Sequence, residues 1–195
     1  SAKVDWQIDE SADSLIALGK IDPLIIVGIY NTVHRSSEYE PTRRGKRYRS
    51  FVVSELKPMI DKNYRTQPEK EFTLTGGSSA GGIVAFMLAW ENPDVFSGAI
   101  CMSPAFKIDD INYVKPVSRY KGPMKDLKFY IDNGGIGLEA RLQPGIDDML
   151  KALQRQGYEE NVDYLWVLDL DAEHFESAWA WRMPLALEFF YSSHD

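Results

Sequence analysis

The sequence predicts an α/β fold with a mostly parallel sheet that helices cover on both faces. Two observations carry this prediction: short apolar runs rich in β-branched residues alternate with amphipathic segments, and no repeat, low-complexity stretch or linker divides the 195 residues. Continuous apolar strands are typical of parallel sheets buried on both faces. A chain of this length suits one domain with one core. We therefore expect a single α/β domain over residues 1–195.

The first half of the chain is predicted to contain two helices and two strands. SADSLIALGK at 11–20 starts with capping residues and ends near a glycine, which is typical of a short helix. PLIIVGIY at 23–30 is a β-branched run, predicted as a strand buried on both faces. Apolar residues at helical spacing predict a helix at 48–64, kinked at Pro58. EFTLT at 71–75 is predicted as a short strand.

The second half continues the same alternation. Its predicted strands are apolar runs at 96–102, 127–132 and 162–170. Its predicted helices lie at 80–92, 144–157 and 176–191. The helix at 144–157 has a proline at its start and a glycine at its end, and the last helix should be kinked near Pro184. About five strands are expected in all.

Composition excludes some classes of function. The formal net charge of −7 argues against nonspecific nucleic-acid binding, which needs a basic surface, and we interpret the basic run at 43–49 as a solvated face. No apolar stretch is long enough to span a bilayer, so no membrane partner is expected. The only cysteine, Cys101, excludes an internal disulfide and lies in an apolar run, where a buried thiol is expected. No signal peptide is present, which leaves the compartment open.

The stretch GGSSAGG at 76–82 joins a predicted strand to a predicted helix. Its glycine spacing does not fit the dinucleotide fingerprint, and apolar residues follow where a P-loop needs Lys and Ser or Thr. Gly77–Gly81 fits G-x-S-x-G instead, the nucleophile elbow that holds a serine in a strained turn. Centring the motif on Ser78 breaks the glycine pattern, so Ser79 is the candidate nucleophile. The alternative is a glycine-rich turn selected only for packing.

A serine nucleophile needs a general base, usually a His held by a carboxylate. In hydrolases with this elbow the chain order is Ser, acid, His, with the His after the last strand. Of the three histidines, His34 precedes the elbow, His194 lies in the tail, and His174 follows the last predicted strand. His174 is therefore the candidate base. A metal site built from His174 and the carboxylates at 169–173 is the alternative, but it lacks a second His, so no metal or cofactor is expected.

The acid should lie just beyond the strand predicted at 127–132. Two carboxylates are candidates: Glu139, within the following loop, and Asp132, at the end of the strand. Asp132 has a competing structural interpretation, because Asp beside Asn-Gly often hydrogen-bonds the backbone of a turn. We favour Glu139 and keep Asp132 as the alternative acid.

Several segments together resemble an esterase family of α/β-hydrolases. The family includes the enterochelin esterases, the feruloyl and acetylxylan esterases of carbohydrate esterase family 1, and the mycolyltransferases. The segments are SFVVSELKPMIDKNYRT, GGSSAGG, VFSGAICMSPAF and HFESAWAWRMPLAL, and the resemblance spans residues 5–191. RSSEY at 35–39 is similar to an Arg-x-x-Glu-Tyr segment of the enterochelin-esterase-like branch, and residues 174–182 to the segment with its catalytic His. The resemblance implies the α/β-hydrolase fold.

The chain departs from the family pattern in two places. Many relatives carry a carboxylate where this chain has Gly137, so the acid is displaced to Glu139, taken by Asp132, or absent, which would leave a Ser-His dyad. Residues 1–10 also lack the His-Asp-Gly-like segment that resembles an oxyanion-hole loop. The part of the chain before residue 11 lacks, in addition, about three of the eight strands that the fold normally has. The N–H of Ala80 is then the one expected oxyanion donor, and losing the other typically costs about 10²–10³ in rate.

We therefore expect an N-terminally incomplete member of the fold, lacking the usual N-terminal strands. Missing strands would leave an exposed sheet edge, which invites pairing with another chain. The sequence thus predicts either a homodimer or a missing partner segment.

The predicted function is that of a serine esterase, which hydrolyses carboxylic acyl esters through an acyl-enzyme on Ser79 with His174 as general base. A small-molecule or carbohydrate-linked ester is the expected substrate, and Arg35 and Trp179 are candidate contacts to it; core packing is the alternative for Trp179. Two other functions stay open. One is an acyltransferase, in which an alcohol resolves the acyl-enzyme. The other is a degenerate hydrolase domain used for binding.

Overall fold

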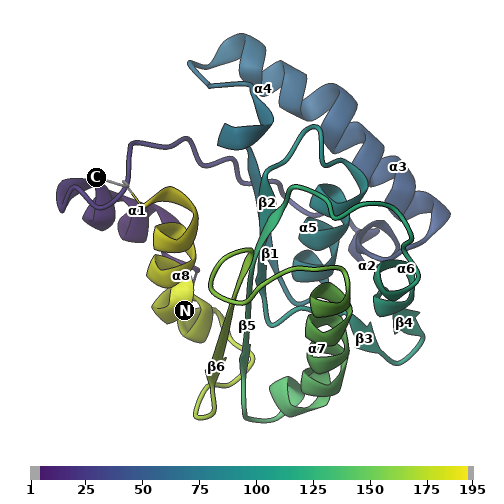
Figure 1. Ribbon diagram of the computed structural model, residues 1–195. Coiled ribbons are helices and arrows are strands. Elements are labelled where there is room, and N and C mark those ends of the chain that lie inside the picture. The colour runs from purple at the N-terminus through teal and green to yellow at the C-terminus, as the bar shows by residue number, and fades with distance from the viewer. Residues whose placement is uncertain (1–4, 193–195) are drawn as a thin grey trace.

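The computed structural model of the chain describes residues 5–192, so His194 lies outside the described residues. At its centre is a four-stranded sheet in the order β1-β2-β5-β6, in which neighbouring strands are parallel (Figure 1). The strands are β1 (Leu74–Ser78), β2 (Gly98–Met102), β5 (Lys128–Gly134) and β6 (Tyr164–Asp169). Each overlaps a run predicted as a strand, which confirms the parallel α/β arrangement.

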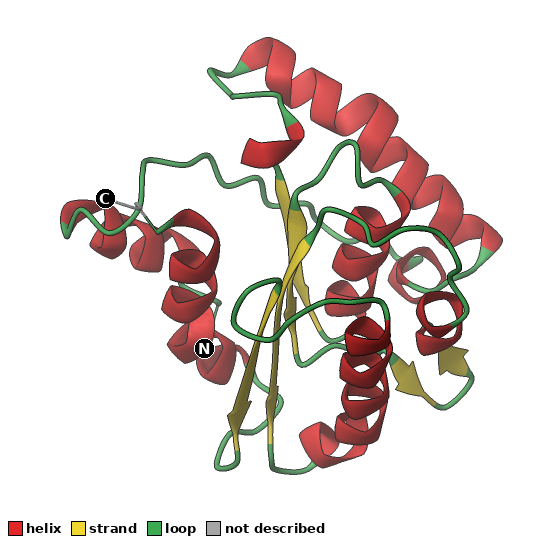
Figure 2. Cartoon of the chain, in the orientation of Figure 1, coloured by secondary structure: helices red, strands yellow, loops and turns green. Residues whose placement is uncertain are grey.

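Helices cover both faces of this sheet (Figure 2). On one face α1 (Ile8–Ala17) packs against α8 (Glu176–Tyr191). On the opposite face lie α5 (Ala80–Glu91) and α7 (Leu138–Arg155). The shorter helices on that side are α2 (Arg35–Tyr39), α3 (Arg43–Phe51), α4 (Lys57–Asn63) and α6 (Val114–Ser118). No helix within residues 5–192 has the length and hydrophobicity to cross a membrane.

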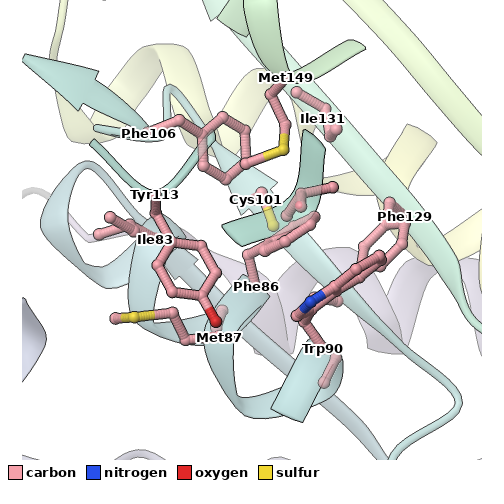
Figure 3. Close-up of a cluster of buried hydrophobic side chains, with 14 of the residues drawn as sticks. Ile83, Phe86, Met87, Trp90, Cys101, Phe106, Tyr113, Phe129, Ile131 and Met149 are labelled. Atoms are coloured by element: carbon pink, nitrogen blue, oxygen red, sulfur yellow. The ribbon is translucent and has the colours of Figure 1, made fainter. Parts of the chain in front are cut away.

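The larger buried cluster lies between the sheet and helices α5 and α7 (Figure 3). Helix α5 is apolar all round, as expected of a helix buried on every side, and its Phe86 stacks on Phe129 of β5 with ring centroids 4.6 Å apart. Cys101 of β2 is fully buried in this cluster, which confirms the predicted buried thiol. Burial raises the pKa of Cys101 well above its usual value, so this thiol is not a nucleophile at neutral pH.

The strand predicted at 23–30 is wrong. These residues form no strand, and the side chains of Ile25, Ile26, Val27 and Ile29 are 40–48% exposed. A strand needs a neighbour for its backbone N–H and C=O groups, and within residues 5–192 no strand lies beside 23–30. The edge of β1 that faces away from β2 is likewise unpaired in the described part of the chain. Dimerisation through such an edge stays a prediction.

Prolines explain how two predicted helices differ from the observed ones. The helix predicted at 48–64 is present, but a π-helical turn (Val52–Leu56) separates α3 from α4. Pro58 cannot donate to the carbonyl of Ser54, and the wider turn accommodates this defect. The helix predicted at 144–157 begins earlier, at Leu138, so Pro144 lies inside it. Glu139 therefore stands in the first turn of α7 rather than in a loop.

The connection at 104–126 contains structure that the sequence pattern does not predict. It forms a short antiparallel ribbon of β3 (Lys107–Ile108) and β4 (Ile111–Asn112), followed by α6. One 3₁₀ turn, Lys70–Phe72, leads into β1. The kink predicted near Pro184 falls within α8, which runs over the predicted range without a break.

Candidate active site

Ser79 occupies the turn between β1 and α5. Its backbone has φ of 56° and ψ of −121°, a left-handed conformation that non-glycine residues seldom adopt. The turn is held from the neighbouring strand: the Ser79 N–H donates to the carbonyl of Met102 (2.9 Å), and its carbonyl accepts from the N–H of Ala105 (3.1 Å). The surroundings thus stabilise a strained serine, which is the geometry of a nucleophile elbow.

The glycines around Ser79 are not equally necessary. A Cβ on Gly77 would lie 2.3 Å from the carbonyl oxygen of Gly81, so strand and helix approach this closely only because residue 77 has no side chain. Gly81 has open space in the direction of a Cβ. Ala80 is the first residue of α5, where a backbone N–H has no partner within the helix. That N–H is available to an external acceptor.

The loops that follow β5 and β6 are tied to each other. The N–H groups of Gly135 and Ile136 both donate to the carbonyl of Ala172, each at 3.1 Å. This contact places Glu139 next to His174, and His174 Nδ1 lies 3.3 Å from Glu139 Oε1. The pair is at ion-pair distance, but Nδ1 does not form a hydrogen bond of good geometry here. Catalytic hydrogen bonds are often loose without substrate and tighten when it binds.

The partners of Glu139 keep its carboxylate ionised. Burial opposes the charge, but the contact with His174 and the hydrogen bond donated by Ser103 Oγ (2.7 Å) outweigh it, so the pKa of Glu139 is lowered. The first turn of a helix also favours a negative charge. A carboxylate, and not a carboxylic acid, therefore faces His174 at neutral pH.

Asp132, the alternative acid, has other partners. Its buried carboxylate accepts hydrogen bonds from Arg182 (Nε, 2.8 Å; Nη2, 3.2 Å), the Ser103 N–H (2.9 Å) and the Tyr130 hydroxyl (3.1 Å). The backbone group that Asp132 Oδ1 accepts from is the N–H of Ser103, after the neighbouring strand, and not an N–H of its own turn as the sequence interpretation expected. Within the described residues, none of the hydrogen bonds or ion pairs of Asp132 reaches His174. This placement supports a structural role for Asp132.

Replacing Asp132 with asparagine is expected to lower the free energy of unfolding by about 3–5 kcal/mol, because Arg182 would lose its buried counter-charge and keep only the partly exposed Asp169 carboxylate, 3.9 Å away. The measurement is urea denaturation. Asp126→Asn makes the same change in an ion pair with Lys70, where the carboxylate is 93% exposed, and should cost less than about 1 kcal/mol. Equal losses in the two variants would contradict a structural role for Asp132.

Ser103 and Arg182 join the site, although the sequence did not identify either as a site residue. Trp179 is 5% exposed, its Nε1–H donates to Ser103 Oγ (2.9 Å), and its ring meets that of His174 edge-on at 5.0 Å. This supports the packing interpretation of Trp179 over a substrate contact. Trp179 and Arg182 are three residues apart, which places both on one face of α8. This spacing is the feature of the sequence that could have indicated that Arg182 lies beside Trp179 at the site.

The remaining predicted residues are less closely connected. No hydrogen bond joins the Ser79 hydroxyl to His174 among residues 5–192; the two are linked through the 102–105 segment, Ser103 and Trp179. Arg35 lies over the ring of Tyr39 in α2, 5.1 Å from its centroid. Trp6 meets Trp179 edge-on at 6.0 Å, so the chain entering α1 lies beside the site.

Two surface hollows among the described residues lie away from the candidate nucleophile. The larger, about 620 Å³, lies between residues 27–32 and α3, beside the segment that lacks a strand partner. The smaller, about 400 Å³, is lined by Glu173 and Phe175, on either side of His174 in the sequence, but not by His174 itself. Neither is lined by Ser79, so the site is assigned from contacts between side chains and not from cavity size.

Comparison with known proteins identifies the family. The family model described as "Putative esterase" matches residues 2–188. The chain belongs to this esterase family. It is 29% identical over 102 residues to an endo-1,4-beta-xylanase/feruloyl esterase of Xylanibacter ruminicola, a match that covers 48% of this chain and 14% of that protein.

Solved structures of esterases share the fold of this esterase-family chain. A ferulic acid esterase matches with a TM-score of 0.75 at 19% identity, covering 95% of this chain and 77% of that one. The enterobactin esterase of Shigella flexneri matches with a TM-score of 0.70 at 16% identity, covering 91% and 46%. These likenesses confirm the predicted α/β-hydrolase fold. The chain spans less than half the length of the curated relative and of the enterobactin esterase.

Proposed function

We propose that this esterase-family chain hydrolyses carboxylic acyl esters through an acyl-enzyme on Ser79. The observation that carries the proposal is the left-handed turn of Ser79 at the carboxyl end of β1. The Glu139–His174 pair follows β5 and β6 and therefore lies at the same edge of the parallel sheet. Strained residues of this kind are concentrated at active sites, and catalytic groups in open α/β sheets gather at the carboxyl ends of strands.

The proposed reaction begins when Ser79 Oγ attacks the ester carbonyl and His174 Nε2 takes its proton. Nδ1 of His174 faces Glu139, which favours the tautomer with the proton on Nδ1 and leaves Nε2 as the acceptor. The tetrahedral oxyanion accepts a hydrogen bond from the Ala80 N–H, at the positive end of α5. His174 then gives the proton to the leaving alcohol. Water repeats the sequence and releases the carboxylic acid.

The names of the similar proteins indicate which esters to try first. They include a feruloyl esterase, a ferulic acid esterase and an enterobactin esterase. We propose small-molecule or carbohydrate-linked esters of aromatic acids as the substrates, with simple p-nitrophenyl esters as convenient reporters. Arg35 stays a predicted substrate contact.

A fluorophosphonate probe tests the proposal, because it phosphonylates activated serines. The expected result is a single label, located on Ser79 by mass spectrometry, together with hydrolysis of p-nitrophenyl acetate and methyl ferulate. Added acceptor alcohols should leave the free acid as the main product; mainly transferred ester would indicate an acyltransferase. If no serine is labelled under conditions that label a known serine esterase, the proposal fails and a binding module is favoured.

A further inference from the structure

The hydroxyl proton of Ser103 has one available direction. Its oxygen accepts hydrogen bonds from two groups that can only donate, the Trp179 Nε1–H at 2.9 Å and the Arg182 Nη2–H at 3.3 Å. The third group bonded to this oxygen is Glu139 Oε1, at 2.7 Å. A serine hydroxyl carries a single hydrogen, so that hydrogen points at Glu139.

The oxygen of Glu139 that receives this proton is the one that faces His174. Oε1 lies 3.3 Å from His174 Nδ1, whereas Oε2 has no hydrogen-bond partner of good geometry among the described residues. The orientation of the carboxylate therefore depends on what holds Oε1. Glu139 is fully buried, so solvent does not replace a missing donor.

The backbone of Ser103 indicates that its hydroxyl is what the site requires. Ser103 has φ of 42°, a conformation in which glycine carries no strain and serine does. Its N–H donates to Asp132, both to the carbonyl (3.1 Å) and to Oδ1 (2.9 Å), and this fixes the turn after β2. A turn chosen only for packing would accept glycine here.

We infer that Ser103 is a positioning residue which, held by Trp179 and Arg182, directs the Glu139 carboxylate at His174. The inference rests on the proposed function, because the Glu139–His174 pair matters for catalysis only if Ser79 is the nucleophile. The charged or titratable groups that interact with Glu139 in the described part of the chain are His174 and Arg182, and Arg182 in turn pairs with Asp132 and Asp169. Arg182 is held by Asp132 through Nε and Nη2, and among the described residues the Ser103 hydroxyl is the one group that forms a hydrogen bond of good geometry to Oε1.

The test replaces Ser103 with glycine, which tolerates the backbone conformation and removes the hydroxyl. We expect kcat on p-nitrophenyl acetate to fall about 10- to 100-fold, with KM within about twofold. The acid limb of kcat against pH should change position, because Glu139 loses the donor that helps to lower its pKa and then holds the base His174 less firmly. Trp179→Phe keeps a ring but removes one donor, and should lower kcat about threefold, since Arg182 still holds the hydroxyl.

Ser97→Ala is the matched control. Ser97 lies just before β2, as Ser103 lies just after it, and its hydroxyl donates to the carbonyl of Thr73 (3.3 Å), away from the site. This variant should keep the wild-type kcat and pH profile. A merely structural role for Ser103 would lower the melting temperature and leave the pH profile where it is.

Three outcomes would overturn the inference. The first is a folded Ser103→Gly variant with wild-type kcat and pH profile. The second applies if Ser103→Gly does not fold, and is a Trp179→Phe variant whose kcat equals that of the wild type. The third is a wild-type protein that fluorophosphonate does not label at Ser79, which removes the proposed function and this inference together. A labelled wild type beside an unchanged Ser103→Gly overturns the positioning role alone.

Discussion

Replacing Ser79 with alanine is expected to lower kcat by about 10⁶-fold, the size of effect seen when a serine nucleophile is removed, and to abolish fluorophosphonate labelling. Alanine carries the same left-handed strain as serine at φ of 56°, and it fills less space. The melting temperature should therefore stay within a few degrees of the wild type. Activity on p-nitrophenyl acetate and the label on the intact protein are the two measurements.

Ser78→Ala is the control, because it makes the same change one residue earlier. Ser78 is the last residue of β1, pairs with Met102 and is half-buried, as Ser79 is. Its loss should change kcat less than about threefold. If Ser78→Ala were inactive and unlabelled while Ser79→Ala retained activity and label, the register of the elbow would be wrong. The proposed mechanism would then be wrong as well.

The parallel sheet could be predicted because its strands are buried on both faces. GAICM in β2 is buried at every position, so an apolar run is all that its environment requires. The run at 23–30 is also apolar and yet forms no strand. An apolar run indicates only that a strand would be stable between two neighbours. Whether those neighbours exist is a property of the rest of the fold.

Some residues of the candidate site could be predicted from their local sequence, and others depend on contacts between distant parts of the chain. Ser79 was accessible to sequence reasoning because its turn is local, and close approach requires Gly77 two residues before it. His174 was accessible through its place after the last strand. Glu139 was harder, because Pro144 concealed the true start of α7. Ser103 could not be predicted from the sequence, because its hydroxyl contacts side chains from α7 and α8 that only the folded chain brings together.

Changing Glu139 to glutamine is expected to lower kcat by about 10³–10⁴-fold, because the charge that faces His174 is lost. Glutamine has nearly the shape of glutamate, and its carbonyl oxygen in the place of Oε1 still accepts the proton of Ser103. The same oxygen faces His174 Nδ1, so the ring keeps its orientation. The imidazolium that forms when Nε2 takes the proton of Ser79 then has no counter-charge beside it. We expect the variant to fold, to bind substrate with a KM near that of the wild type and to turn over very slowly.

Glu173→Gln is the matched control, since Glu173 adjoins His174 in sequence but is exposed. It should keep kcat within about threefold of the wild type. A wild-type kcat in Glu139→Gln, together with a large loss in a folded Asp132→Asn variant, would instead assign the acid to Asp132. The two substitutions therefore separate the carboxylate that orients His174 from the one that holds Arg182.

The pH dependence of stability gives a second readout for Glu139→Gln. Contacts in the folded protein lower the pKa of Glu139, so its carboxylate contributes stability above the pKa of the unfolded chain, about 4.3. That contribution is lost as the pH falls through the lower folded value. Glutamine does not titrate. The difference in unfolding free energy between wild type and variant should therefore shrink below about pH 4, and a constant difference would mean that Glu139 is not held ionised by Ser103 and His174.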